Sequence, residues 1–106
     1  MSKIDISIII PTYKRENQVF KIIKTIQKQI LKSINIEILI CDSFSKYNKK
    51  KLKINKKNFK VKYINITKNN LSAKRNHGIN KSKYNNIILI DDDCIPKKKI
   101  HFRLFK

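Results

Sequence analysis

The fold is decided by the stretch Asn85-Asn86-Ile87-Ile88-Leu89-Ile90-Asp91-Asp92-Asp93-Cys94-Ile95-Pro96, in which four apolar residues run directly into three carboxylates. A run this short and this apolar predicts a strand buried on both faces, as in a parallel sheet covered by helices. Three adjacent acids repel one another unless a positive group lies close. Because hard cations take carboxylate oxygens as ligands, the acids predict a divalent-cation site for a phosphorylated ligand. The alternative is an acidic start to a following helix.

Three earlier strands are predicted, at 5–10, 36–41 and 60–66, the last with the alternation of a strand nearer an edge. Helices are expected between them. The first carries an apolar stripe from Val19 to Ile30, the second runs from Ala73 to about Ser82 with Ser72 as its N-cap, and a short one is expected at 47–54. This alternation predicts an α/β fold: a parallel, doubly wound, Rossmann-like sheet with strand order 3-2-1-4.

Ligands of such sheets bind beyond the carboxyl ends of the strands, at the switch point between the first and fourth strands. The residues predicted at those ends are Pro11-Thr12-Tyr13, Asp42 and Asp91-Asp92-Asp93. No glycine-rich loop follows the first strand, which excludes dinucleotide-binding and P-loop motifs. The phosphates of a ligand would therefore be neutralised by a metal held on the carboxylates.

The chain of 106 residues is long enough for one small domain, and its hydrophobic content of 41% predicts a folded core. We interpret most of the net charge of +19 as compositional bias, because the lysines are scattered without interleaved aromatic residues, and we expect no specific nucleic-acid partner. Cys41 and Cys94 are expected to be buried thiols. The absence of a leader or an apolar span favours the cytoplasm, with attachment to the membrane surface by charge as an alternative.

Four blocks of the sequence resemble the inverting GT-A glycosyltransferases of family 2. They are 7–15 (SIIIPTYKR), 38–43 (ILICDS), 73–78 (AKRNHG) and 88–93 (ILIDDD), in the family's order and at fitting spacings. The resemblance covers nearly all of residues 1–106, but only the N-terminal, nucleotide-binding half of the family domain. It implies transfer of a sugar from a nucleotide diphosphate sugar, UDP-linked in most members, to a saccharide or lipid-linked acceptor.

The resemblance also implies roles for the residues of the first two blocks. Pro11, Thr12 and Tyr13 would line the pocket for the nucleotide base, with Tyr13 packed against the ring. Asp42 would accept a hydrogen bond from the base, and Arg15 would lie at the rim. Without the resemblance, Tyr13 would be read as a half-buried aromatic residue and Asp42 as the cap of a turn.

The last two blocks match the parts of the family that handle the phosphates. Lys74 and Arg75 would face the nucleotide, and Gly78 would permit close packing of the helix. Asp93 and Asp91 would bind Mg²⁺ or Mn²⁺, while Asp91 or Asp92 addresses the ribose. The alternative for Lys74 and Arg75 is a solvated helix face. His77 is expected at the surface.

The carboxylate that serves the family as catalytic base lies beyond the acidic triplet and has no counterpart here. The remaining acids, Asp5, Glu16 and Glu37, are not expected to reach an acceptor. We therefore expect a truncated donor half that binds its nucleotide sugar without transferring the sugar alone. Two other functions stay open: a non-catalytic cationic fragment that binds nucleotides or polyanions, and a nucleotidyltransferase-like domain.

Overall fold

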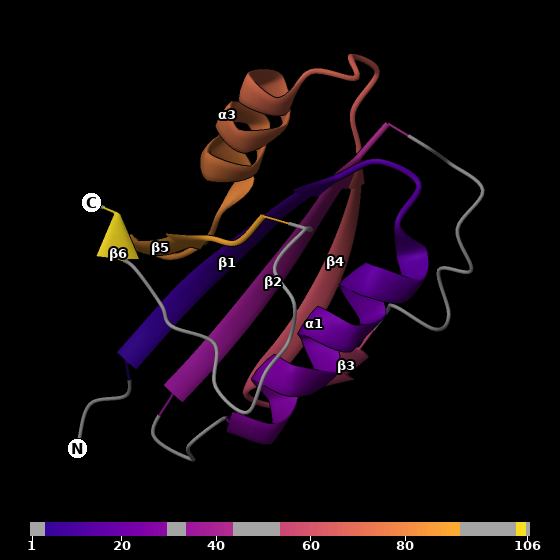
Figure 1. Ribbon diagram of the computed structural model, residues 1–106. Coiled ribbons are helices and arrows are strands. Elements are labelled where there is room, and N and C mark those ends of the chain that lie inside the picture. Colours follow the sequence, from indigo (N-terminus) through magenta and orange to yellow (C-terminus); the bar gives the residue numbers. More distant parts are fainter. Residues whose placement is uncertain (1–3, 30–33, 44–53, 92–103, 106) are drawn as a thin grey trace.

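The computed structural model describes residues 4–29, 34–43, 54–91 and 104–105. Six strands form one sheet in the order β3-β4-β2-β1-β5-β6, with α1 on one face and α3 on the other (Figure 1). The elements are, in chain order, β1 (Ile4–Thr12), α1 (Glu16–Gln29), β2 (Ile34–Asp42), β3 (Ile54–Lys56), β4 (Phe59–Asn65), α3 (Leu71–Lys81), β5 (Asn86–Leu89) and β6 (Leu104–Phe105).

The four strands predicted from the sequence are parallel neighbours in the predicted order, as β4-β2-β1-β5. The sheet also has two antiparallel edge strands that the sequence analysis missed. β3 pairs with β4, and β6 pairs with β5. The helix expected at 47–54 lies outside the described residues except at Ile54, where it is wrong, because Ile54 begins β3 and pairs with Val61.

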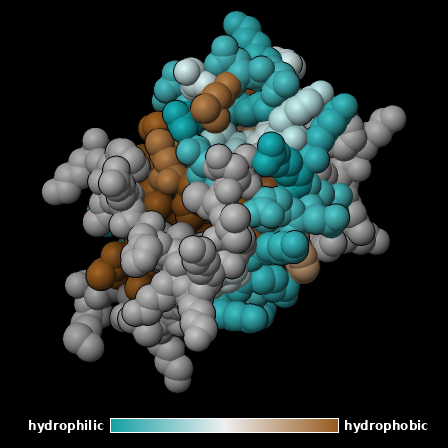
Figure 2. Space-filling view, in the orientation of Figure 1, coloured by the Kyte–Doolittle hydropathy of each residue, from teal (hydrophilic) through white to brown (hydrophobic). Residues whose placement is uncertain are grey.

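Alternate side chains of the central strands pack on opposite faces of the sheet. Ile8 and Ile10 of β1 join the cluster beneath α1, whereas Ile9 belongs to the smaller cluster on the other face. The α1 side of this core contains the predicted stripe of Val19, Ile22, Ile23 and Ile26, each at most 1% exposed. Full burial of such a side chain contributes about 1.5–3 kcal/mol. The outward surface of α1 is hydrophilic (Figure 2).

Gly78 lets α3 approach the sheet closely, as the resemblance implied. A Cβ atom at this position would lie 2.6 Å from Ile9 Cγ2 and 3.0 Å from Cys41 Sγ. Cys41 is a buried free thiol, as expected, and burial raises its pKa to about 12, an effect that Lys74 partly opposes. Cys94 lies outside the described residues.

The predicted N-cap of α3 is wrong by two residues. The helix begins at Leu71, and the cap is Asn70, whose extended backbone (φ −136°, ψ 126°) lets its side-chain oxygen accept a hydrogen bond from Ala73 N at 3.1 Å. Asparagine and serine are about equally good caps, so propensity alone did not separate the two positions. Among the described helices, neither is long and apolar enough to cross a membrane.

Candidate functional site

A pocket of about 290 Å³ opens at the carboxyl end of β1, beside the start of α3. We call it the Tyr13 pocket. Its lining residues are Pro11, Thr12, Tyr13, Arg15, Asn69, Leu71 and Lys74. Five of these seven were predicted to bind the nucleotide. The sequence analysis missed Asn69 and Leu71, although both follow the carboxyl end of a predicted strand, which is where ligand-binding loops of such sheets lie.

Lys74 joins the two sides of the Tyr13 pocket. The residue is only 3% exposed, and its Nζ donates hydrogen bonds to the Thr12 carbonyl and to Asn69 Oδ1, both at 2.7 Å. Nζ also lies 5.1 Å from the centroid of the Tyr13 ring. Lys74 is therefore not part of a solvated helix face. It fixes the end of β1 to the loop before α3 and places a positive charge in the pocket wall.

Tyr13 presents a large apolar surface at the pocket. The residue is 41% exposed, and the ammonium group of Lys14 lies 5.2 Å from its ring centroid. Lys14 has a positive φ of 56°, an uncommon conformation for a residue other than glycine. This turn leads from the strand into α1, whose first turn includes the hydrogen bond from Val19 N to Arg15 O at 2.9 Å. Arg15 is exposed and lines the Tyr13 pocket.

Asp42 ends β2 at the same level of the sheet as Thr12, its neighbour in the register. It is fully buried and is not among the residues that line the Tyr13 pocket. Burial raises the pKa of Tyr63 to about 12, and the negative charge of Asp42 raises it further in the same direction. Asp42 therefore lies at the predicted strand end, on the β4 side of the pocket, but the described residues do not bring it to the pocket surface.

Arg75 and Asp91 form an ion pair at the carboxyl end of β5. Arg75 Nη2 donates to Asp91 Oδ1 at 2.9 Å, and both side chains are partly exposed. Asp91 follows Ile90, whose N–H extends the pairing with β1 through a 3.0 Å hydrogen bond to Ile9 O. A pair exposed to this degree contributes about 0–1 kcal/mol, so a ligand can displace it at little cost.

The metal site predicted at Asp91 and Asp93 falls only partly within the described residues. Asp92 and Asp93 lie outside them. Within the ranges that the structure describes, no three histidine, cysteine or acidic side chains gather as a metal-binding group. Asp91 is partly exposed after the end of β5, and its Oδ1 is occupied by Arg75, so a cation would have to displace this guanidinium group to bind there.

His77 is exposed on α3, as predicted. Glu37 lies five residues before Asp42 on β2, and so lies away from the carboxyl ends of the strands, again as predicted.

Comparison with known proteins gives a match over residues 7–104 to the model of a family described as Glycosyl transferase family 2. The chain belongs to this family. All four sequence blocks that carry the resemblance lie within the matched range, so the resemblance to family 2 is confirmed. The mixed α/β architecture with a mostly parallel sheet agrees with it. The family is named for the transfer of glycosyl groups, which is the general activity that the resemblance implied.

The family 2 chain is also similar to one curated protein, the poly(ribitol-phosphate) beta-N-acetylglucosaminyltransferase TarP of Staphylococcus aureus (strain N315). The two are 32% identical over 92 residues. The alignment covers 83% of this chain and 28% of the relative, so the chain spans less than a third of the length of the protein that it matches.

Proposed function

We propose that the Tyr13 pocket binds the nucleotide of a UDP-sugar, and that this chain supplies the donor-binding part of a glycosyltransferase. The observation that carries the proposal is the convergence of Pro11, Thr12, Tyr13, Arg15 and Lys74 on one cavity at the carboxyl end of β1. These residues come from two blocks separated by nearly sixty positions in the sequence. Their meeting at the predicted edge of the sheet is a property of the fold.

In this proposal the pocket recognises the base by stacking and the phosphates by charge. The partly exposed Tyr13 ring offers a face to uracil, and stacking on an aromatic side chain contributes about 1–3 kcal/mol per base. Arg15 in the lining of the pocket and Lys14 beside the Tyr13 ring supply positive charge for the phosphates. Asp42 is buried in the present conformation, so its carboxylate would have to become exposed before it could accept a hydrogen bond from the base.

The proposal includes Mg²⁺ or Mn²⁺, held by Asp91 and Asp93, with Asp92 beside the ribose. When bound, the cation would offset the negative charge of the departing diphosphate. Arg75 would then leave Asp91, and its guanidinium group would become available to the phosphates. The weak, partly exposed ion pair between the two side chains supports such an exchange.

The acceptor in the proposal is a hydroxyl group on a saccharide or lipid-linked molecule. The relative is named for transferring N-acetylglucosamine to poly(ribitol phosphate), so UDP-N-acetylglucosamine is the first donor to test. We assign no catalytic base. Two of the described acids lie away from the Tyr13 pocket. Glu37 is buried, and Asp5 lies near the end of β1 opposite the pocket.

Calorimetric titration with UDP-N-acetylglucosamine, UDP, ADP and inorganic pyrophosphate tests the donor site. We expect UDP to bind more tightly than ADP or pyrophosphate, with a further gain on adding Mn²⁺. Tyr13→Ala should weaken UDP binding by at least tenfold, because the stacking surface is lost. The control is Ile79→Ala, which removes an exposed apolar side chain of α3 that lines neither cavity and should leave UDP affinity unchanged.

Equal binding of UDP, ADP and pyrophosphate would instead support the second function considered, a cationic fragment that binds polyanions without selecting a nucleotide. An affinity unaffected by Mn²⁺ would remove the metal from the proposal and leave the pocket in place.

A further inference from the structure

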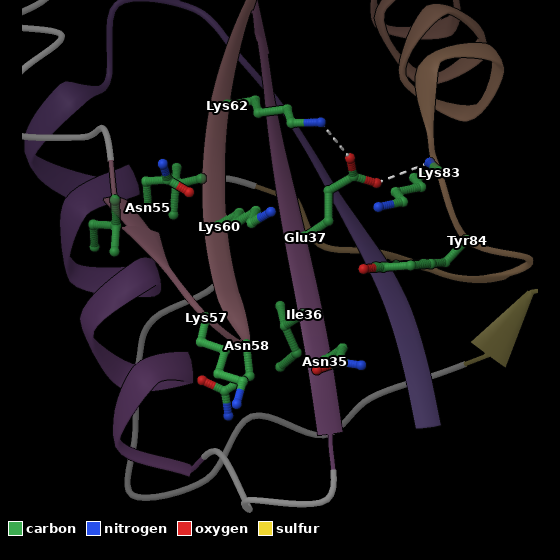
Figure 3. A pocket seen from close by; sticks show the side chains of 12 residues that line it. Asn35, Ile36, Glu37, Asn55, Lys57, Asn58, Lys60, Lys62, Lys83 and Tyr84 are labelled. Carbon is green, nitrogen blue, oxygen red and sulfur yellow. Dashed lines mark hydrogen bonds and ion pairs between the residues drawn. The ribbon is translucent and has the colours of Figure 1, made fainter. Parts of the chain in front are cut away.

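A second cavity, of about 430 Å³, lies over the amino-terminal part of β2 and β4 and is bounded by the loop that follows α3 (Figure 3). We call it the Glu37 trough. It shares no lining residue with the Tyr13 pocket. Glu37 and Asp42 are five residues apart on the same strand, which corresponds to about 16 Å at the rise of a parallel strand. The two cavities are therefore separate sites.

The trough is built on a buried carboxylate. Glu37 is only 3% exposed, and its Oε2 accepts hydrogen bonds from Ser7 Oγ at 2.8 Å and Lys83 N at 2.9 Å. Its Oε1 accepts from Lys62 Nζ at 3.0 Å. Ser7 Oγ in turn accepts from Tyr84 N at 3.1 Å. These bonds tie three strands and the loop after α3 to one carboxyl group, so the walls of the trough are held in place.

Positive charge exceeds negative charge at this carboxylate. The ammonium groups of Lys60, Lys62 and Lys83 point toward Glu37 from both sides of the trough, and the Tyr84 hydroxyl points into it as well (Figure 3). One of the three lysine charges is balanced by Glu37, through the ion pair with Lys62. The other two have no acidic partner among the residues that line the trough.

We propose that the Glu37 trough binds a phosphate group, with Lys60 and Lys83 as its main ligands and the Tyr84 hydroxyl as an additional donor. A phosphate monoester carries a charge of about −1.5 to −2 at neutral pH, opposite in sign to the excess of positive charge in the trough, whose lining holds four lysines and one carboxylate. Lysine binds phosphate as a point charge through its three donors. Glu37 orients Lys62 and the Lys83 backbone rather than contacting the anion.

This inference does not depend on the proposed donor site, because the two cavities have no residue in common. It also differs from general attraction to a cationic surface. The lysines of α1, such as Lys21 and Lys28, are exposed on a helix and line neither the Glu37 trough nor the Tyr13 pocket. A site should therefore be lost when the trough lysines are changed and kept when an equal number of α1 lysines are changed.

The test is an NMR titration of the ¹⁵N-labelled chain with inorganic phosphate at constant ionic strength, adjusted with chloride. The amides of Lys83 and Tyr84 are the reporters, because both donate hydrogen bonds in the floor of the trough. We expect saturable shifts of these two signals in the wild-type chain. The double variant Lys60→Gln/Lys83→Gln should weaken binding at least fivefold, while Lys21→Gln/Lys28→Gln, with the same net charge, should bind as the wild type does.

Glycerol 3-phosphate and dimethyl phosphate extend the titration to the two sources of such a group, a small phosphomonoester and the diester backbone of a polymer. Tighter binding of glycerol 3-phosphate would assign the trough to small phosphomonoesters. Tighter binding of dimethyl phosphate would assign it to the diester backbone of a polymer. Equal weakening in both double variants, or shifts that do not saturate in the wild type, would overturn the proposal. If the trough double variant fails to fold, Tyr84→Phe replaces it as the test, because this change removes only a hydroxyl group. Tyr84→Phe should weaken phosphate binding by a smaller factor than the double variant.

Discussion

At the scale of single residues, Lys74 changes the interpretation of the site most. In the sequence it is one lysine among many, and the default for such a residue is a solvated helix face. In the structure it is buried and bonded to Thr12 and Asn69. The sequence had no means of showing this, because the partners lie on a different strand end and on a loop whose position depends on where α3 begins.

Replacing Lys74 with methionine should impair both stability and ligand binding. The change leaves the Thr12 carbonyl and Asn69 Oδ1 without their donor, and an unsatisfied buried polar group costs about 1–3 kcal/mol. We expect a lower free energy of unfolding by that amount in urea titration, and UDP binding weakened about tenfold in calorimetry. Lys81→Met, at an exposed position of the same helix, is the control. Unchanged UDP affinity in a folded Lys74→Met chain would mean that Lys74 only supports the fold.

Glu37 should make stability depend on pH in the acidic range. Burial alone would raise the pKa of its carboxyl group, but the hydrogen bonds from Lys83 N, Ser7 and Lys62 and the charge of Lys62 together lower it below its ordinary value of 4.5. A lowered pKa in the folded state contributes stability above the unfolded-state pKa, and this contribution is lost as pH falls through the folded-state value. The melting temperature should therefore decrease below about pH 4.5 more steeply in the wild type than in Glu37→Gln.

The control for this measurement is Glu16→Gln, which removes a carboxylate from the first turn of α1 and should keep most of the wild-type pH dependence. Parallel curves for the wild type and Glu37→Gln would show that the Glu37 carboxyl group does not have the lowered pKa. At neutral pH, Glu37→Gln should cost about 1–3 kcal/mol, because it weakens hydrogen bonds to a charged acceptor.

At the scale of elements, α3 depends on one glycine. The residue at position 78 meets Ile9 and Cys41, both fully buried in the sheet. Ile9 is branched at Cβ and has little freedom to move its Cγ2 atom away. The sequence block predicted a close approach at Gly78, but the identity of the neighbours came only from the fold.

Gly78→Ala should therefore destabilise the chain despite the better helix propensity of alanine. The propensity gain is about 1 kcal/mol, whereas overpacking of a filled core costs about 1–3 kcal/mol. We expect a net loss of up to about 2 kcal/mol in the free energy of unfolding. Asn80→Ala, at an exposed position of the same helix, has the propensity gain without the clash and should be neutral or stabilising. A Gly78→Ala chain as stable as Asn80→Ala would show that the helix can move away from the sheet.

At the scale of the whole molecule, the order of the four parallel strands was predicted from the usual order of doubly wound sheets, a fold class that the alternation of strand and helix patterns indicated. The two antiparallel edge strands, β3 and β6, could not be predicted from the sequence. β3 has three residues and β6 has two, too few for periodicity to distinguish them from loops. The outer face of α1 is hydrophilic (Figure 2), and the exposed large apolar side chains include Ile4 at the start of β1 and Leu71 and Ile79 on α3. Of the residues that line the Tyr13 pocket, those at the end of β1 and Lys74 were predicted, whereas Asn69, before α3, and Leu71, its first residue, were missed.

The charge of the whole molecule leads to a prediction about nucleic acid. If the net charge of +19 is compositional bias, duplex DNA should bind weakly, without sequence preference, and with an affinity that falls steeply as salt rises, because binding then consists of counterion release. Fluorescence anisotropy with two duplexes of equal length and unrelated sequence, at several salt concentrations, measures this. Lys21→Gln/Lys28→Gln and Lys24→Gln/Lys81→Gln, two pairs of exposed lysines outside both cavities, should weaken DNA binding equally, since each pair removes two positive charges. A duplex preferred at physiological salt would instead require a specific nucleic-acid site, which the scattered lysines and the absence of interleaved aromatic residues argue against.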